Sequence, residues 1–439
     1  MKKQTVAGPA SVRFRDALKF WVKLGFINFG GPAGQIAMMQ HELVDSKQWV
    51  SQLQFVRALN FCMILPGPEA QQLAIYIGWR LHGTVGGTIA GSFFVIPSIF
   101  VLLALSWMAV VSAEMPAIQG LLYGVQPVVI AIVASAVLRI GKKTLCHWGL
   151  FLYAFTAFAA LHSFDVPFPY VIGLAAVSGM VLERFWPHVF ESCSIRHGPV
   201  APEIGAEAAG NSRPTITRNL KLIAIFALLW GVPASALLMW RGAQDILFQE
   251  AILFSKAAFV TFGGAYAVLS YIADMAVNHY GWLSAHQMVQ GLGLAESTPG
   301  PLIMVTQYIG FVAAWNTNTG FNPLFNATLG ALIATYMTFL PCFFFIFLGA
   351  PYIELLSQNR RIRAALVGVT SAVVGVIVNL AVFFGQKVLF PGTGAFDYFA
   401  AAVALVSFGF AWRTRIPMHY LVPVGALAGM AWRLLGYGS

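Results

Sequence analysis

Charge is scarce in this chain. Only 10% of its 439 residues are Asp, Glu, Lys or Arg, and 58% are hydrophobic. A soluble domain usually carries about 25% charged residues, so a water-soluble globule of this composition would have too little polar surface. Apolar runs of roughly 20 residues, the length that crosses a bilayer core, recur along the sequence. The composition therefore predicts an all-α polytopic membrane protein surrounded by the lipid bilayer.

The signatures of several enzyme classes are also missing. The sequence has no Walker A loop, no GxSxG and no HExxH, so ATP-driven or hydrolytic chemistry within the chain is not expected. The nine histidines are scattered without ligand spacing, so no metal or other cofactor is expected. No apolar stretch precedes Phe20, and a cleaved signal peptide is therefore not expected. The cysteines form no CxxC pair, which favours packing over a zinc or disulfide framework; they are Cys62, Cys146, Cys193 and Cys342.

Acidic residues are scarcer than basic ones, 16 against 26, which gives a net charge of +10. In a soluble protein this excess would suggest a nucleic-acid partner. In a membrane protein it is explained first by lysines and arginines that collect in cytoplasmic loops. No nucleic-acid partner is therefore expected, and part of the excess also suits an anionic substrate.

Hydropathy predicts two groups of six apolar segments, separated by a linker and one further span. The less apolar stretch 185–219, rich in Gly, Pro, Ala and Glu, indicates the linker. We expect a first transporter repeat at 1–184, a linker with one extra span at 185–249, and a second repeat at 250–439. The segments lie at 20–39, 53–79, 84–111, 118–140, 146–163 and 166–184, then 220–240, then 250–272, 286–312, 325–348, 363–385, 395–412 and 416–435.

The two groups repeat each other in sequence. KLGFINFGGPAG begins at Lys23, and KAAFVTFGGAYA begins at Lys256, an offset of 233 (256 − 23). The same ungapped offset places the Pro-Gly-Pro of 66–68 on the Pro-Gly-Pro of 299–301. Later the offset becomes 244, where Pro97 matches Pro341. A register that keeps Lys, FGG and PGP together is not easily a chance match, so we infer an internal duplication.

A single span between two six-segment halves requires the halves to have opposite orientations, and the basic residues test this independently. In the first half they follow the second, fourth and sixth segments, at Arg80, Arg139 and Arg184 among others. In the second half they follow the third and fifth, at Arg360 and Arg413 among others. Both sets face the cytoplasm only if the second half is inverted, with the N-terminus inside and the C-terminus outside. Inverted repeats are a transporter architecture with the site near mid-membrane.

Strong helix breakers lie inside four of the apolar segments. Backbone groups left unpaired in hydrocarbon cost several kcal/mol, so irregular backbone survives there only where protein or a water-filled cavity satisfies it. We therefore expect broken or re-entrant helices, with new half-helices starting near Glu69 and Leu302, whose free N–H groups bind an oxyanion. The alternative is that Gly and Pro merely allow kinks and close packing. The breaks are Gly30, Gly31 and Pro32; Pro66, Gly67 and Pro68; Gly263 and Gly264; and Pro299, Gly300 and Pro301.

Three basic residues in the broken segments are candidate anion ligands. Lys23 and Lys256 occupy equivalent positions before the two FGG motifs, and Arg57 lies just before the first Pro-Gly-Pro. Ionisable residues in spans are expensive to insert and are therefore functional candidates. The alternative for the lysines is that they extend to the membrane surface. The alternative for Arg57 is an ion pair with Glu69 or Glu42.

Two carboxylates and several amides flank the breaks. Glu69 and Glu296 are candidates for proton coupling, because a carboxylate in a dry cavity holds its proton more tightly. The alternative for Glu69 is simple capping of a helix N-terminus. The neutral donors Gln35, Gln71 and Gln72 are further candidates for substrate contact, although each is weak evidence alone.

Over essentially its whole length the sequence resembles the chromate ion transporter family in its long form with two homologous halves. The resemblance rests on FINFGGPAGQIAMMQHELV and PGPEAQQLAIYIGWRLHG in the first half, and on FVTFGGAYAVLSYI and STPGPLIMVTQYIGF in the second. The second half has Ala265 where the first has Pro32, and Leu302 where the first has Glu69, which implies that the halves have divided labour. The motif residues that the resemblance marks as functional are Gly30, Gly31, Pro32, Gln35, Pro66, Gly67, Pro68, Glu69, Gln71, Gln72, Gly263, Gly264, Pro299, Gly300 and Pro301.

The resemblance implies chromate efflux across the bacterial inner membrane and chromate resistance, with sulfate as the structural mimic. The predicted function is thus a secondary transporter that exports a tetrahedral oxyanion, and not an enzyme. Two alternatives stay open: an importer of sulfate or another oxyanion, and a membrane-embedded enzyme acting on an anionic lipid or reducing the oxyanion. The sequence leaves a homo-oligomer open.

Overall fold

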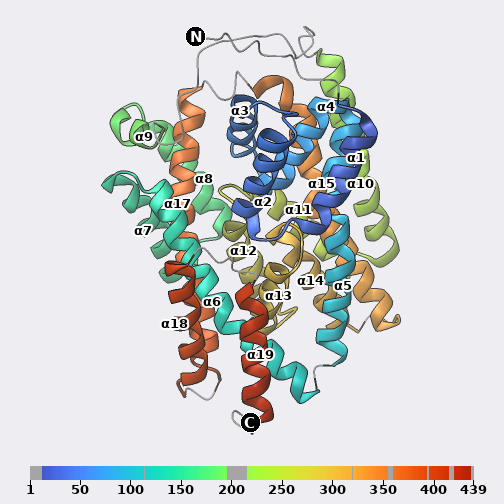
Figure 1. Cartoon of the computed structure of the whole chain (residues 1–439), viewed down its shortest axis with the longest axis vertical. Helices are drawn as coiled ribbons and strands as arrows, with labels where there is room; N and C mark the ends of the chain where they lie inside the picture. The colour runs from blue at the N-terminus through green and yellow to red at the C-terminus, as the bar shows by residue number, and fades with distance from the viewer. Residues whose placement is uncertain are drawn as a thin grey trace.

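The computed structural model describes residues 12–112, 114–194, 215–318, 320–353, 359–392, 395–414 and 420–436 (Figure 1). Within these ranges the regular structure is helical and contains no strand, which confirms the all-α expectation. Five described stretches are long and apolar enough to cross a membrane: Glu69–Val111, Pro116–Thr144, Ile216–Arg241, Pro323–Tyr352 and Arg360–Leu389.

In the first half, each of the two predicted N-terminal segments is divided into two helices. The FGGP motif separates α1 (Phe14–Ile27) from α2 (Gly31–Gln40), and the Pro-Gly-Pro motif separates α3 (Gln52–Cys62) from α4 (Glu69–Phe93). The breakers therefore interrupt the helices where the sequence predicts. The remaining helices of this half are α5 (Ile96–Val111), α6 (Pro116–Thr144), α7 (Trp148–Ser163) and α8 (Phe168–Leu182), followed by α9 (Pro187–Ser194) and α10 (Ile216–Arg241) in the linker region.

The second half repeats this pattern. FGGA separates α11 (Ile246–Val260) from α12 (Ala265–Ala273), and Pro-Gly-Pro separates α13 (Ala285–Ser297) from a short 3₁₀ turn and α14 (Val305–Asn316). The long helices that follow are α15 (Pro323–Gly349), α17 (Arg360–Leu389), α18 (Tyr398–Arg413) and α19 (Leu421–Leu434).

Matched sequence positions form matched local structure in the two halves. Ser51 caps α3 and Ser284 caps α13, and each forms a capping box with the glutamine three residues later, Gln54 and Gln287. The serine side chain accepts from that residue's N–H while the glutamine side chain accepts from the serine N–H, so two otherwise unpaired donors are satisfied. A π-helical turn follows α2 and another follows α12. The duplicated sequence thus specifies duplicated helix ends.

The two halves are interleaved in space. Helix α6 of the first half packs along α18 and α19 of the second, and α17 of the second packs along α7 and α8 of the first. Glycines allow the closest approach: a Cβ at Gly124 would lie 2.0 Å from the Gly425 carbonyl oxygen, and one at Gly375 would lie 1.9 Å from that of Ala154. Such small-residue contacts are typical of helix pairs in membranes.

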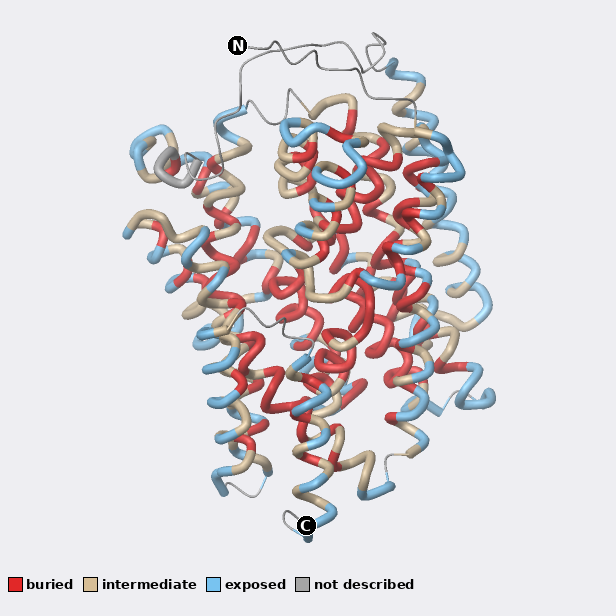
Figure 2. The backbone as a smooth tube through the Cα atoms, in the orientation of Figure 1, coloured by how far each residue is buried: buried red, intermediate tan, exposed pale blue. Residues whose placement is uncertain are grey.

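Burial is concentrated in the middle of the molecule (Figure 2). The second-half helices α12, α13 and α14 are almost continuously buried, whereas only 6% of the most apolar part of α10 is buried. A peripheral apolar helix of membrane length has lipid as its natural surroundings. The short broken helices are thus the core of the fold, and they are surrounded by the longer ones.

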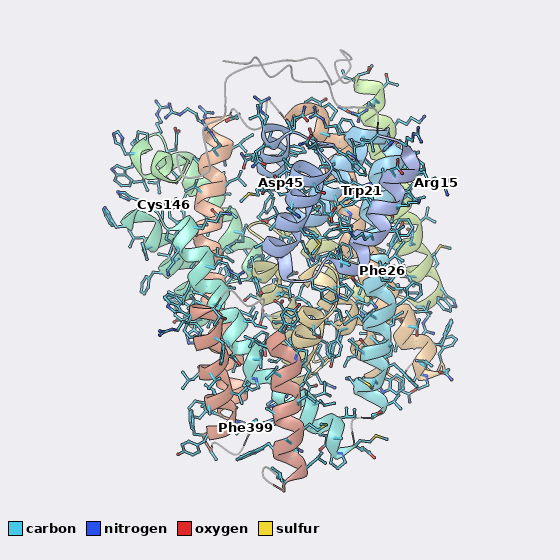
Figure 3. The ribbon with its side chains drawn as sticks, viewed as in Figure 1. Arg15, Trp21, Phe26, Asp45, Cys146 and Phe399 are labelled. Atoms are coloured by element: carbon cyan, nitrogen blue, oxygen red, sulfur yellow. The ribbon has the colours of Figure 1, made fainter. Side chains whose placement is uncertain are left out.

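The cysteine expectation is wrong at one position. Cys146, labelled in Figure 3 beside α7, is disulfide-bonded, whereas Cys62 and Cys342 are free and buried. A lone cysteine spacing does not reveal which residues the fold brings together, which is why the bond was missed. Cys193 lies where side chains are not described.

Candidate functional site at the four helix breaks

The motif glycines at the four breaks adopt backbone conformations that other residues rarely take. Gly30 and Gly31 have φ values of 92° and 65°, and Gly263 and Gly264 have 77° and 100°. The glycines inside the two Pro-Gly-Pro motifs, Gly67 and Gly300, have nearly equal values of 127° and 128°. Positive φ costs a residue with a side chain free energy, so these positions favour glycine. The backbone of the four breaks therefore accounts for the glycines in both motifs.

Reciprocal backbone hydrogen bonds join the breaks of the two halves. The Gly67 N–H donates to the Thr261 carbonyl at 2.8 Å, and the Gly300 N–H donates to the Asn28 carbonyl at 3.2 Å. The residues correspond at the repeat offset, since 67 + 233 = 300 and 28 + 233 = 261. Each Pro-Gly-Pro therefore meets the FGG break of the other half. In this conformation the amides of Gly67 and Gly300 are used by the protein and are not free for an anion.

Polar side chains complete the pairing of these irregular segments. Gln35 Nε2 donates to the carbonyls of Asn28 at 2.8 Å and Gly300 at 2.5 Å, and Gln72 Nε2 donates to the Pro66 carbonyl at 2.7 Å. The Ser98 hydroxyl donates to the Pro299 carbonyl. All three side chains are fully buried. They satisfy carbonyls that the breaks leave without helical partners, so these glutamines act as supports of the backbone.

Gln71, the third predicted amide, also bonds a backbone carbonyl. Gln71 is buried, and its Nε2 donates to the Gly91 carbonyl at 3.3 Å within the first half. Its Oε1, like that of Gln35 and Gln72, has no hydrogen-bond partner among the described residues. An acceptor oxygen does not attract an anion, so direct substrate contact by these side chains requires a different amide orientation.

The helix N-termini after the FGG motifs are more open than the Pro-Gly-Pro breaks. A Cβ on Gly31 would have no heavy atom within 4 Å, and a Cβ on Gly264 would meet only the Glu69 carboxylate, 3.9 Å from Oε1. Glu69 begins α4 in the first half, and Gly264 caps α12 in the second. Glu69 thus places a carboxylate beside the amino end of α12, where helix N–H groups favour negative charge.

Two basic residues of α6 contribute positive potential at Glu69 and Glu296, the two carboxylates predicted for proton coupling. Lys143 of α6 is close enough to interact electrostatically with Glu69, and Arg139 interacts with Glu296. They are one helical turn apart and therefore share a face of α6. The spacing could have revealed them, because RIGKK puts a basic residue on the same face every fourth position. The intervening Lys142 lies over the Trp412 ring instead, 4.1 Å from its centroid.

Glu296 has a direct partner in its own half. The Tyr266 hydroxyl donates to Glu296 Oε1 at 2.5 Å, and both residues are buried. Tyr266 lies in the first turn of α12, next to Gly264. The open end of α12 is therefore bordered by Glu69 from one half and by the Tyr266–Glu296 pair from the other.

The three predicted basic ligands lie farther out or have other partners. Lys23 is exposed and forms an ion pair with Glu42 at 3.3 Å, and its repeat equivalent Lys256 is also exposed. Arg57 is half-buried on α3 and makes interactions of its own. The exposure of both lysines agrees with the alternative that their side chains extend to the membrane surface.

Two cavities lie among the described residues. One, of about 400 Å³, is bordered by Lys19, Lys23 and Lys47 together with Asp16 and two aromatic rings. The other, of about 140 Å³, is apolar, lies between α5, α6, α13 and α19, and reaches Ser297 just before the second Pro-Gly-Pro. Among the described residues no group of His, Cys, Asp or Glu has the arrangement of a metal site.

The fold and the breaks define a class: a multi-pass helical membrane protein in which discontinuous helices from two repeats meet, the arrangement of secondary transporters. The chain belongs to the chromate transporter family, whose sequence profile matches residues 15–180 and 248–430. This confirms the resemblance seen in the motifs. The family is one of transporters and not of enzymes.

Curated relatives of similar length support the assignment. The chain is 29% identical over 438 residues to the chromate transport protein of Pseudomonas aeruginosa, covering 97% of this chain and 94% of that one. It is 27% identical over 420 residues to the probable chromate transport protein of Synechococcus elongatus, covering 95% of both chains. The chromate transport protein of Cupriavidus metallidurans is 28% identical over 373 residues, 85% of this chain and 83% of that one. No solved structure matches the chain.

Proposed function

We propose that this protein is a secondary transporter that exports chromate from the cytoplasm and thereby confers chromate resistance, in the inner membrane of a bacterium. The observation that carries the proposal is the reciprocal bonding of the four breaks, Gly67 to Thr261 and Gly300 to Asn28. It joins irregular backbone from both repeats at one place, which is how transporters build a substrate site. Membership of the chromate transporter family and the printed functions of the relatives support chromate as the substrate.

The two repeats have opposite orientations in this proposal. Several features support inversion: the reciprocal bonds, the exchange of α6 and α17 between halves, and the basic residues that change parity. In Figure 1, α1 to α3 lie in the upper part of the molecule and α18 and α19 in the lower part. In this proposal the upper end faces the cytoplasm.

The oxyanion binds at the open amino end of α12 in this proposal. Helix N–H groups around Gly264 supply donors, and Lys143 and Arg139 of α6 supply positive charge. The Glu69 carboxylate lies beside this end, where a Cβ on Gly264 would be 3.9 Å from its Oε1. Arrival of a dianion requires Glu69 to move away or take a proton, because two negative groups repel at this distance. This gives Glu69 its role in coupling.

The membrane potential favours export. Moving one elementary charge through a potential of 100 mV changes the free energy by about 2.3 kcal/mol. A doubly charged oxyanion leaving a negative interior therefore gains about twice that amount. The site at the breaks needs to bind the dianion only weakly, because the membrane potential itself drives the anion outward.

Growth and retention in cells test the proposal. Cells that express the protein and cells with an empty vector receive chromate, and intracellular chromate is measured over time. The proposal predicts lower retained chromate and growth at higher chromate concentration in the expressing cells. Higher chromate uptake together with rescue of growth on limiting sulfate would instead identify an oxyanion importer. Reduction of chromate by the purified protein would indicate an enzyme.

A further inference from the structure

Glu250 is a buried carboxylate that the transport site does not use. It lies one turn into α11 and is 0% exposed. Neither Oε1 nor Oε2 has a hydrogen-bond partner among the described residues. A buried charge without a partner is strongly destabilising, and the usual outcome is that the group stays neutral. An unpaired carboxylate at this depth therefore indicates a bound proton.

The carboxylate lies against a close crossing of two helices. A Cβ on Gly330 of α15 would lie 2.5 Å from the carbonyl oxygen of Gly310 in α14 and 2.9 Å from Glu250 Oε2. The glycine leaves the space that the carboxylate occupies. The protonation of Glu250 consequently depends on whether α11 is packed against this crossing, because moving α11 away would take the carboxylate out of its dry surroundings.

Among the described residues, no basic side chain forms a hydrogen bond or ion pair with Glu250. The one charged group that acts on it is Asp245, which is itself held by Arg241 at 2.8 Å. Of the helices packed against α11, α10 carries Arg218, Lys221 and Arg241, and Arg241 is the one paired with Asp245. Helices α12, α14 and α15 contribute no charged side chain. Their titratable groups are Tyr266, Tyr271, Tyr308, Tyr336 and Cys342.

The repeat provides an internal comparison. The residue 233 positions before Glu250 is Ala17, which is also buried. The first half has an equally close glycine crossing, since a Cβ on Gly78 would lie 2.5 Å from the Gly86 carbonyl oxygen. An alanine therefore satisfies the packing of this fold at the equivalent place. The carboxylate of Glu250 is not needed for that packing.

We propose that Glu250 is a proton-binding site that links external pH to the transport cycle. The carboxyl group carries one proton while α11 is packed against the Gly310–Gly330 crossing. It releases that proton to water at the Arg241–Asp245 end of α11 when the helix moves during transport. Since α11 leads directly into the FGG break at Gly263 and Gly264, its movement changes the substrate site. The linkage to transport rests on the proposed function; the proton site itself does not.

Infrared difference spectroscopy of the purified full-length protein tests the proton site directly. The wild-type protein should show the carbonyl band of a protonated carboxyl group at neutral pH, and Glu250→Gln should lack part of it. Asp245→Asn is the matched control and should keep the Glu250 contribution. A spectrum of Glu250→Gln equal to the wild-type spectrum in this band would overturn the assignment, whatever the protein transports.

Chromate flux tests the linkage. In proteoliposomes with a clamped membrane potential, pH is varied on the Asp245 side from about 6 to about 8. The chromate flux of the wild-type protein should change roughly fivefold or more over this range. The flux of Glu250→Gln and of Glu250→Ala should change less than about twofold. Retention of the wild-type pH dependence in both variants would overturn the linkage. Absence of chromate flux in the wild-type protein under all conditions would instead count against the proposed function, and with it the linkage.

Discussion

Two neighbouring lysines at the end of α6 have different surroundings and therefore different expected roles. Lys142 and Lys143 are adjacent and both exposed, yet Lys142 lies over Trp412 while Lys143 acts on Glu69. Sequence alone assigns both to the positive-inside pattern. Only the fold, which brings α6 to the break of the opposite half, distinguishes them. The same holds for Glu250, whose sequence position looks like the beginning of a span but whose carboxylate is fully buried.

Lys143→Gln should weaken chromate transport by raising KM. Losing one positive charge near a dianion site removes roughly 1.4 kcal/mol of attraction, which corresponds to about a tenfold increase. The initial rate of chromate flux against chromate concentration measures this. Lys142→Gln is the matched control and should stay within about twofold of the wild type, because its side chain faces Trp412. Equal effects of the two substitutions would argue for a diffuse surface charge and against a site at α12.

At the scale of elements, the sequence predicts the breaks well because Pro and Gly act locally. The half-helices begin at Glu69 and Leu302 as expected. The partners of the breaks are not predictable in the same way, because Gly67 and Thr261 are brought together only by the fold. The contacts of Gln35 and Gln72 were not predictable for the same reason. The motif marks these residues as functional, but only the structure reveals that they donate hydrogen bonds to backbone carbonyls.

Replacing either Pro-Gly-Pro by Ala-Ala-Ala should abolish transport. Alanine favours a continuous helix, which would displace the backbone that Gly67 or Gly300 places against the opposite repeat. Chromate flux and membrane insertion are measured together, and insertion should be retained. Pro233→Ala is the control, since it removes a proline inside the peripheral helix α10 and should leave flux nearly unchanged. Full activity of both triple variants would show that the breaks are not part of the transport path.

At the scale of the whole molecule, the two repeats exchange helices and meet at their breaks. Duplication is visible in the sequence because the motifs recur at one offset. The exchange of α6 and α17 is not, because small residues such as Gly124 and Gly375 recur throughout apolar sequence. Five membrane-length stretches are found among the described residues, and several predicted spans are pairs of shorter helices instead.

Inversion predicts opposite labelling of two equivalent residues. Asp45, labelled in Figure 3, and Asn278 are both exposed and are 233 positions apart. In intact cells, a membrane-impermeant maleimide should label only one of Asp45→Cys and Asn278→Cys from outside and leave the other unlabelled until the membrane is opened. The native protein is the control, because Cys62 and Cys342 are buried. Labelling of both variants from the same side would exclude inverted repeats.

The most direct measurement of the whole account is chromate flux into vesicles that hold only the purified protein. With the vesicle interior made positive, the account predicts accumulation of labelled chromate above that in protein-free vesicles, competition by excess sulfate, and loss of accumulation when the potential is collapsed. Chromate content equal to that of protein-free vesicles at every potential would contradict it.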